Sequence, residues 1–151
     1  MDKLPQIKGK YIPNAEIGKM SRFGVGGNAE VLYYPSDLDD LCNFLRNVDK
    51  TIPIMVMGAT SNLLIRDGGI KGVVIKLSEN SEFGAIKEED NLLKAGAAVS
   101  DLALARYAVE NAISGFEFLS GIPGTVGGAI RMNTGAYGMD VAEILHSVVA
   151  V

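Results

Sequence analysis

Apolar and polar positions follow one another along the chain in blocks that predict short strands separated by turns. A strand is expected at residues 30–34, where Pro35 stops it. The apolar run at 52–57 predicts a buried strand, which resumes at 63–65 after a break, and residues 72–77 predict another. Residues 82–87 and 91–95 are typical of a hairpin whose tip is the acidic run 88–90.

Helical spacing appears in three places. Leu38, Leu41, Cys42 and Leu45 predict an amphipathic helix with Ser36 as its N-cap and Asp39 completing a weak capping box. Cys42 would then be a small buried apolar residue. Residues 100–115 predict a second helix, capped by Ser100 and stopped by Gly115, and Thr125 would cap a short third one.

The order of these elements predicts an α+β protein made of two small units. Residues 1–20 are polar and without periodicity, which indicates an N-terminal tail. The units are expected at 21–79 and 80–151. A last strand is expected to begin at Ile144 and to include His146. Because the chain ends inside it, we expect the second unit to be incomplete and the chain to be the front part of a longer protein.

Composition narrows the functional class. The chain of 151 residues is 48% hydrophobic and 21% charged, as in globular proteins, and its net charge of -4 argues against non-specific nucleic-acid binding. One cysteine and one histidine leave no disulfide framework and no metal centre to expect. No apolar run approaches the roughly 18 residues that cross a bilayer, and no signal peptide is evident. We therefore expect a cytoplasmic protein without membrane partners.

Residues 58–62, GATSN, directly follow the run at 52–57. A glycine after a buried strand lets the backbone turn so that successive amides bind an anion, and Ser61 and Asn62 add side-chain donors. A phosphate or diphosphate is the matching ligand. A tight turn without a ligand is the alternative. The glycines at 24–28, GVGGN, are better explained as a turn before the first strand than as a phosphate loop.

Residues 121–138, GIPGTVGGAIRMNTGAYG, contain six glycines among eighteen residues. Glycine permits positive φ, close packing of backbone on backbone, or close approach of backbone to a ligand. A planar or diphosphate ligand explains this density, and tight chain–chain packing is the alternative. Arg131 is either a phosphate ligand or solvated, and Tyr137 either lines a pocket or is half-buried.

Together these blocks show a resemblance to a known family. Residues 21–35, SRFGVGGNAEVLYYP, 52–77 and 115–138 resemble the N-terminal half of UDP-N-acetylenolpyruvoylglucosamine reductases, the MurB family, and the similarity covers residues 21–151. The resemblance implies an FAD-binding domain of the vanillyl-alcohol-oxidase (PCMH) type, with FAD between two α+β subdomains. The second would be truncated here and the substrate domain absent.

The resemblance also assigns roles to particular residues. It implies that the FAD diphosphate is held by Gly58, Ala59, Thr60, Ser61 and Asn62. The flavin and its ribityl chain would lie along Ile122, Pro123, Gly124, Thr125, Gly127, Gly128 and Ala129. Asn133, Gly135 and Ala136 would complete that wall, and Tyr137 would approach the substrate.

The activity implied is the NADPH-dependent reduction of UDP-N-acetylglucosamine enolpyruvate to UDP-N-acetylmuramate for peptidoglycan. The family's proton-donating serine, its glutamate and its arginine come from segments beyond Val151, so no catalytic residue is expected in this chain. The chain alone is expected to be inactive and to self-associate through exposed sheet edges. Another PCMH-type oxidoreductase and a non-catalytic nucleotide-binding module are the alternatives.

Overall fold

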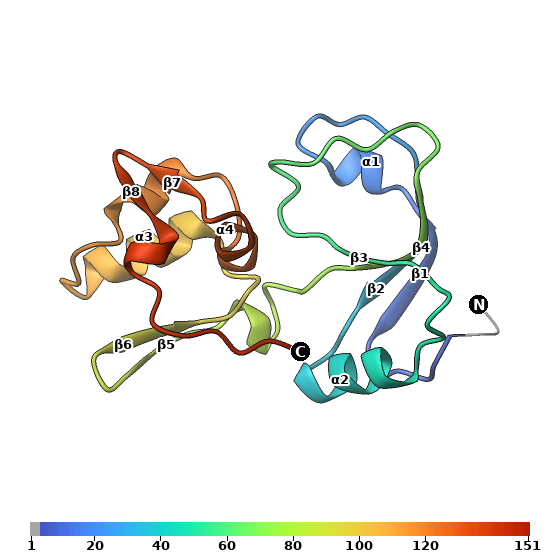
Figure 1. Cartoon of the computed structure of the whole chain (residues 1–151), viewed down its shortest axis with the longest axis horizontal. Coiled ribbons are helices and arrows are strands. Elements are labelled where there is room, and N and C mark those ends of the chain that lie inside the picture. Colours follow the sequence, from blue (N-terminus) through green and yellow to red (C-terminus); the bar gives the residue numbers. More distant parts are fainter. Residues whose placement is uncertain (1–3) are drawn as a thin grey trace.

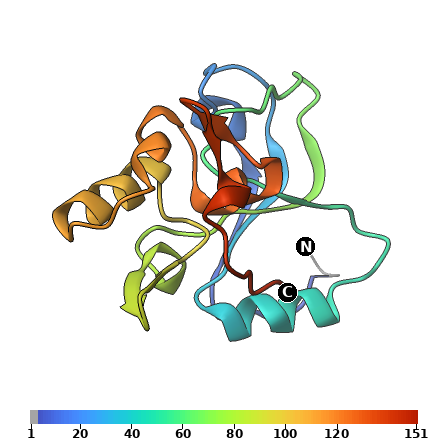
Figure 2. The ribbon, with the colours of Figure 1, turned by 60° about the vertical axis from the view of Figure 1, so that its left-hand side comes forward.

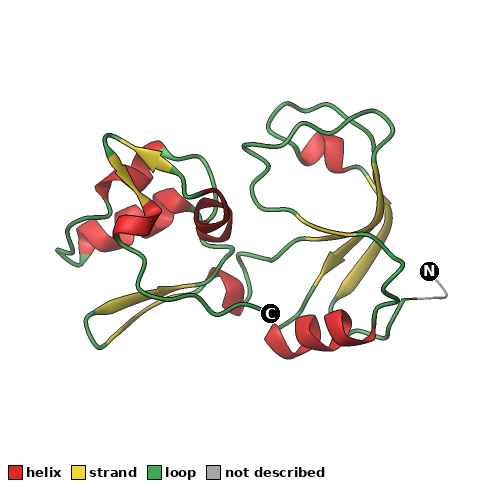
Figure 3. Cartoon of the chain, in the orientation of Figure 1, coloured by secondary structure: helices red, strands yellow, loops and turns green. Residues whose placement is uncertain are grey.

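The chain forms two lobes, each of which contains helices and strands (Figures 1 and 3). This computed structural model describes residues 4–151, so the first three residues of the expected tail lie outside it. The lobes are joined by the segment between strands β4, Ile70–Ile75, and β5, Ile86–Glu89. The mixture of helices and strands confirms the predicted α+β class.

A four-stranded sheet forms the first lobe of the described chain, in the order β1-β2-β4-β3. Its other strands are β1, Lys10–Ala15, β2, Ala29–Tyr34, and β3, Ile54–Val56. β1 is antiparallel to β2, whereas β4 is parallel to both β2 and β3. The sheet therefore has β1 and β3 as its two edges.

Both faces of this sheet are covered, which explains why β2 and β4 read as nearly continuous apolar runs. On one face Tyr33 and Val73 pack against Phe44 of helix α2, Leu38–Asn47. On the other face Leu32 and Val74 pack with helix α1, Ile17–Met20, and the loop that follows β3. Successive residues of a strand thus enter two different hydrophobic clusters. Figure 2 shows α2 below the sheet and α1 above it.

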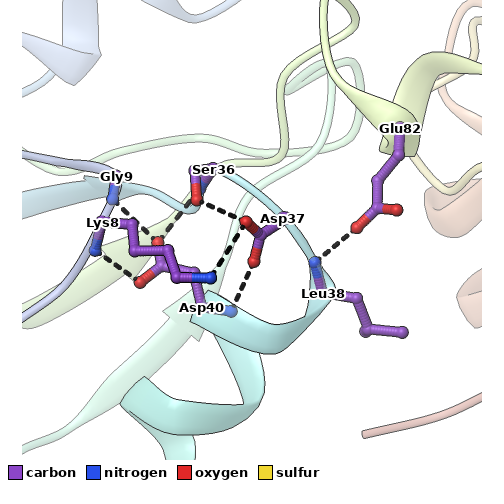
Figure 4. A network of polar contacts seen from close by, with 7 residues as sticks. All are labelled: Lys8, Gly9, Ser36, Asp37, Leu38, Asp40 and Glu82. Carbon is purple, nitrogen blue, oxygen red and sulfur yellow. Dashed lines mark hydrogen bonds and ion pairs between the residues drawn. The ribbon is translucent and has the colours of Figure 1, made fainter.

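A network of hydrogen bonds joins the N-terminal segment to the start of α2 (Figure 4). The buried Asp40 carboxylate accepts hydrogen bonds from the amides of Lys8 at 2.7 Å, Gly9 at 2.9 Å and Ser36 at 3.0 Å. Burial raises the pKa of Asp40, but the bonds from Lys8 and Ser36 outweigh burial and lower it. This carboxylate therefore fastens the beginning of the sheet to α2.

The second lobe is built on a hairpin, two helices and a short ribbon. β5 pairs with β6, Leu92–Ala95, and the chain continues into helix α3, Asp101–Glu110. Helix α4, Val126–Met132, leads into β7, Gly135–Ala136, and β8, Met139–Asp140. Short 3-10 turns occupy Glu82–Gly84, Glu117–Gly121 and Val141–Glu143. The core of this lobe contains Val99, Leu104, Ala105, Phe118, Leu119, Ala129 and Val141.

Most of the predicted elements are confirmed. The strands expected at 30–34, 52–57 and 72–77, the hairpin, and the three helices all form close to their expected positions. Ser100 caps α3 by accepting a hydrogen bond from the Ala103 amide, and Thr125 caps α4. Gly24 and Gly26 adopt positive φ in the turn that precedes β2. The local rules of periodicity and capping were sufficient for these elements.

The prediction of an N-terminal tail at residues 1–20 is wrong for residues 10–20. β1 and α1 both lie within residues 10–20, and β1 pairs with β2. The strand was missed because it is a half-exposed edge strand containing Pro13. Proline lacks an amide donor, so its presence normally excludes the interior of a sheet but not an edge.

Other boundaries also differ from prediction. Asp37, not Ser36, caps α2, and Cys42 is only partly buried. β3 is an edge strand in which Val56 is 67% exposed, and residues 63–65 form a loop against the sheet. α3 ends at Glu110, five residues before Gly115. No strand begins at Ile144 or includes His146.

Candidate functional site

Loop 58–62 follows β3 and is held on both sides by the first lobe. The Met57 amide donates to the Ile75 carbonyl at 2.8 Å, and the Thr60 hydroxyl is 3.3 Å from the Met20 carbonyl of α1. Thr60 itself adopts a positive φ of 61°. Within residues 4–151, no group accepts a hydrogen bond from the amides of residues 58–62. The loop therefore offers several free backbone donors, as an anion-binding nest requires.

This loop meets the glycine-rich segment of the second lobe. A β-carbon added to Gly58 would lie 2.9 Å from the Thr125 hydroxyl oxygen. A β-carbon on Gly124 would lie 2.6 Å from a carboxylate oxygen of Asp101 and 3.8 Å from the Ser61 hydroxyl. Gly58 thus allows the loop to approach Thr125 closely, and Gly124 makes room for the Asp101 carboxylate. The structure brings Gly58, Ser61, Gly124 and Thr125 together from positions more than sixty residues apart along the chain.

The N-terminus of α4 is close to this junction but is not a free anion site. The Val126 amide donates to the Val99 carbonyl at 2.9 Å, and the Gly127 amide donates to the Ala97 carbonyl at 3.0 Å. The Gly128 amide is 3.4 Å from the capping hydroxyl of Thr125. The first amides of the helix are therefore already used within the chain, which leaves loop 58–62 as the stronger donor of hydrogen bonds to an anion.

Most of the glycines between 121 and 138 pack closely against other parts of the chain. Chain–chain packing, the alternative to a bound ligand, therefore accounts for most of the glycine density in this segment. Gly127 lies against Ala97, where a β-carbon would be 2.9 Å from the Ala97 methyl. Gly121 lies under the ring of Tyr137, and Gly135 lies against the Met139 carbonyl. Gly128 is different: it is exposed, and an added β-carbon would meet only the Thr125 hydroxyl at 3.4 Å. Gly128 is the glycine of α4 that packing alone does not require.

The predicted residues after α4 lie at the other end of that helix, about 10 Å along its axis from Thr125. Asn133 ends the helix in the left-handed conformation, and its side-chain oxygen accepts from the Ala142 amide at 2.9 Å. Gly135 and Ala136 form β7. The half-buried position considered for Tyr137 is wrong, because this residue is 83% exposed and has a φ of 56°.

Sequence reasoning missed two charged residues beside the junction. Asp101 is fully buried, and neither carboxylate oxygen has a hydrogen-bond partner within residues 4–151. Burial raises its pKa to about 6. Lys76 follows β4, and its ammonium donates to the Gly58 carbonyl at 2.9 Å. Two features of the sequence could have drawn attention to them. Asp101 is an acidic residue at the first position of a predicted helix, and Lys76 is a charged residue at the end of an apolar strand.

Two other features of the described residues do not compete with this site. A hollow of about 460 Å3 lies beside α2, but its buried Asp40 is already bonded to backbone amides; its lining is Gln6, Ile7, Lys8, Asp39, Asp40 and Asn43. Arg131 is exposed, as the solvated alternative expected. Within residues 4–151, His, Cys, Asp and Glu side chains do not form a group of three that could hold a metal ion.

The chain resembles known flavin proteins over this same region. The sequence model of a family described as "FAD binding domain" matches residues 29–151. The UDP-N-acetylenolpyruvoylglucosamine reductase of Parvibaculum lavamentivorans is 43% identical over 151 residues, which is 100% of this chain and 48% of that protein. The reductase of the same name from Rickettsia massiliae is 47% identical over 148 residues, covering 98% of this chain and 50% of the relative.

A solved structure agrees with these relatives. The crystal structure of UDP-N-acetylenolpyruvylglucosamine reductase (MurB) from Thermus caldophilus aligns with a TM-score of 0.68 and 27% identity, over 91% of this chain and 46% of the other. The chain thus spans about half the length of the proteins it matches.

Proposed function

The chain belongs to the family of FAD-binding domains, and from this premise we propose that it is the flavin-binding part of a UDP-N-acetylenolpyruvoylglucosamine reductase. The observation that carries the proposal is the junction of loop 58–62, with its free amides, and residues 121–128. The full activity proposed is the NADPH-dependent reduction of a UDP-sugar enolpyruvyl ether in peptidoglycan synthesis. The relatives bearing that enzyme name support it over other oxidoreductases or a non-catalytic module.

The diphosphate of FAD fits loop 58–62. Its free amides supply donors, and the side chains of Ser61 and Asn62 add two more. Ala59 and Asn62 are exposed, while Thr60 is buried, with its hydroxyl 2.6 Å from the Ala59 carbonyl and 3.3 Å from the Met20 carbonyl of α1. In this assignment Gly58 and Thr60 shape the loop, and the remaining three residues face the ligand.

The segment 122–129 fits one wall for the flavin and its ribityl chain. Gly128 offers an exposed surface without a side chain, on which a flat ring can lie against the helix. Gly124, Thr125 and Gly127 act through packing, since they set the approach of α4 to loop 58–62 and to Ala97. Asn133, Gly135 and Ala136 would extend the wall beyond the helix, and the exposed Tyr137 would face the substrate.

When bound, FAD would carry the two electrons from the nicotinamide donor to the substrate alkene. The described chain would contribute binding and orientation: loop 58–62 would hold the anionic end of FAD, and α4 would offer a surface to the flavin. We place the proton donor of the reaction outside residues 4–151. The chain alone is therefore expected to bind FAD without turning over substrate.

Three further predictions belong to this proposal. We place the boundary of the two FAD-binding subdomains between residues 79 and 80, in the connection that joins the lobes. Self-association through a sheet edge stays a prediction, and the exposed Ile54 and Val56 of β3 are its best candidates. A cytoplasmic location is also proposed; among residues 4–151 no helix is long and apolar enough to cross a membrane.

Titration of the chain with FAD, followed by flavin fluorescence, tests the proposal. We expect saturable binding that Ser61→Ala weakens by roughly 10- to 100-fold, because a hydrogen bond to a charged oxygen contributes about 1.5–3 kcal/mol. Ser147→Ala is the control, since Ser147 is exposed and lies outside the site. Absence of saturable binding to the wild-type chain would contradict the proposal.

A further inference from the structure

Lys76 lies directly behind the loop that we assign to the diphosphate. Its backbone amide donates to the Tyr33 carbonyl at 2.9 Å, which fixes the residue at the end of β4. Its side chain is partly buried, and the ammonium group reaches the Gly58 carbonyl at 2.9 Å. An ammonium group has three donors, so this contact leaves two of them available.

The contact sets the direction of the peptide that begins the loop. In a planar trans peptide the carbonyl and the following N–H point in opposite directions. Because the Gly58 carbonyl faces Lys76, the Ala59 amide faces away from the lysine and is free to donate to a ligand. The positive charge also polarises this peptide in the sense that strengthens the amide as a donor.

The charge of Lys76 has no counter-ion within hydrogen-bonding distance. The three ion pairs found within residues 4–151 join Lys8 to Asp37, Lys19 to Glu16 and Lys94 to Glu89. Burial lowers the pKa of Lys76, and the more distant Glu79 only partly opposes this effect. Keeping an ammonium group partly buried without a counter-ion is unfavourable, and a bound anion would offset that cost.

An acidic side chain also lies beside the junction. The carboxylate of Asp101 lies 2.6 Å from the β-carbon position of Gly124, and the Ser61 hydroxyl lies 3.8 Å from the same position. When Asp101 is ionised, it repels a diphosphate held by Ser61. A cation near the loop offsets this repulsion.

We propose that Lys76 is a positioning residue of the diphosphate site, which orients the Gly58–Ala59 peptide and supplies the positive charge behind loop 58–62. This inference rests on the proposed function, because it assumes that the loop holds the FAD diphosphate. It adds a residue to which the resemblance assigned no role, and it requires no direct contact between the lysine and FAD.

The test compares FAD titrations of the wild-type chain and of Lys76→Met, Lys76→Arg and Lys71→Met at low and high ionic strength. Lys71 is the matched control because it is an exposed lysine on β4, the strand that Lys76 directly follows. We expect Lys76→Met to raise the Kd for FAD about tenfold, Lys76→Arg to restore part of the loss, and Lys71→Met to leave it unchanged. Salt should weaken binding to the wild-type chain more than to Lys76→Met.

Thermal unfolding without FAD separates an effect on binding from an effect on folding. Lys76→Met replaces a partly buried ammonium that has no counter-ion with an apolar side chain of similar length, so its Tm should be equal to or above that of the wild type. An unchanged Kd, an unchanged salt dependence, or a Tm that falls together with affinity would overturn the inference. A wild-type chain that binds no FAD would instead overturn the proposed function, and this inference with it.

Discussion

Asp101 shows what a single residue reveals when its surroundings are known. It begins α3, where a carboxylate near the first turn is ordinarily favourable. Here the side chain is fully buried beside Gly124, and neither oxygen is paired within residues 4–151. The carboxylate therefore lacks the hydrogen bonds that the equally buried Asp40 obtains from three backbone amides.

Asp101→Asn is expected to stabilise the ligand-free chain in a pH-dependent way. Burial raises the folded-state pKa from 3.8 to about 6, so the folded chain binds more protons than the unfolded one between these values. Wild-type stability therefore decreases as pH rises through this window and stays reduced above it. Asparagine does not ionise, so the variant should gain on the order of 2 kcal/mol relative to wild type between about pH 4 and pH 8.

Urea unfolding at about pH 4 and about pH 8 measures this difference in the free energy of unfolding. Asp67→Asn is the control, because Asp67 is exposed in the turn before β4 and should show no comparable change. A difference between Asp101→Asn and wild type that is the same at both pH values would show that the carboxyl finds a partner that the structure lacks.

At the scale of elements, α4 combines a packing role with the binding role that we propose for it. Thr125 caps it, Asn133 ends it in the left-handed conformation, and Ala129 is buried in the core. Its two adjacent glycines face different surroundings: Gly127 packs on Ala97, whereas Gly128 is exposed. Packing therefore requires a glycine at position 127 but not at position 128.

Gly127→Ala and Gly128→Ala are expected to have opposite effects on stability. At position 128 alanine fits and should stabilise the helix by up to about 1 kcal/mol, because glycine is a poor helix former. At position 127 the added methyl would lie 2.9 Å from the Ala97 methyl and 3.0 Å from its carbonyl, so it should lower the Tm.

FAD binding then distinguishes the two roles of these glycines. Gly128→Ala should weaken FAD binding while the ligand-free Tm rises, because the methyl group would occupy the surface assigned to the flavin. A Gly128→Ala variant that is more stable and binds FAD as tightly as wild type would remove Gly128 from the flavin wall.

At the scale of the whole molecule, the proposed FAD site is formed by both lobes. Loop 58–62 extends from the four-stranded sheet, and residues 121–128 belong to the second lobe. Neither segment alone contains both the free amides and the surface at Gly128. A ligand that contacts both segments therefore stabilises their contact as well as each lobe.

Hydrogen exchange with and without FAD tests this coupling. We expect slower exchange with FAD in both 58–62 and 121–129, and little change at the tip of the β5–β6 hairpin, which lies on the far side of the second lobe from the sheet (Figure 1). Protection confined to one of the two segments would show that FAD does not bridge the lobes.

The sequence by itself determined the elements whose rules are local. Periodicity predicted α2, α3 and the strands β2 and β4, and side-chain caps predicted the starts of α3 and α4. Two motifs predicted the segments that we assign to the flavin. The edge strand β1 was missed because an edge tolerates exposure and proline, so its pattern carries little signal.

Only the tertiary structure decided what each residue of those segments does. Whether a glycine contacts a ligand or the chain depends on which segment lies opposite, and for Gly124 and Gly127 the neighbours are Asp101 and Ala97. The roles of Lys76 and Asp101 depend on charge and burial at the meeting of distant segments. Such long-range proximity has no local pattern, because it is produced by the packing of the two lobes.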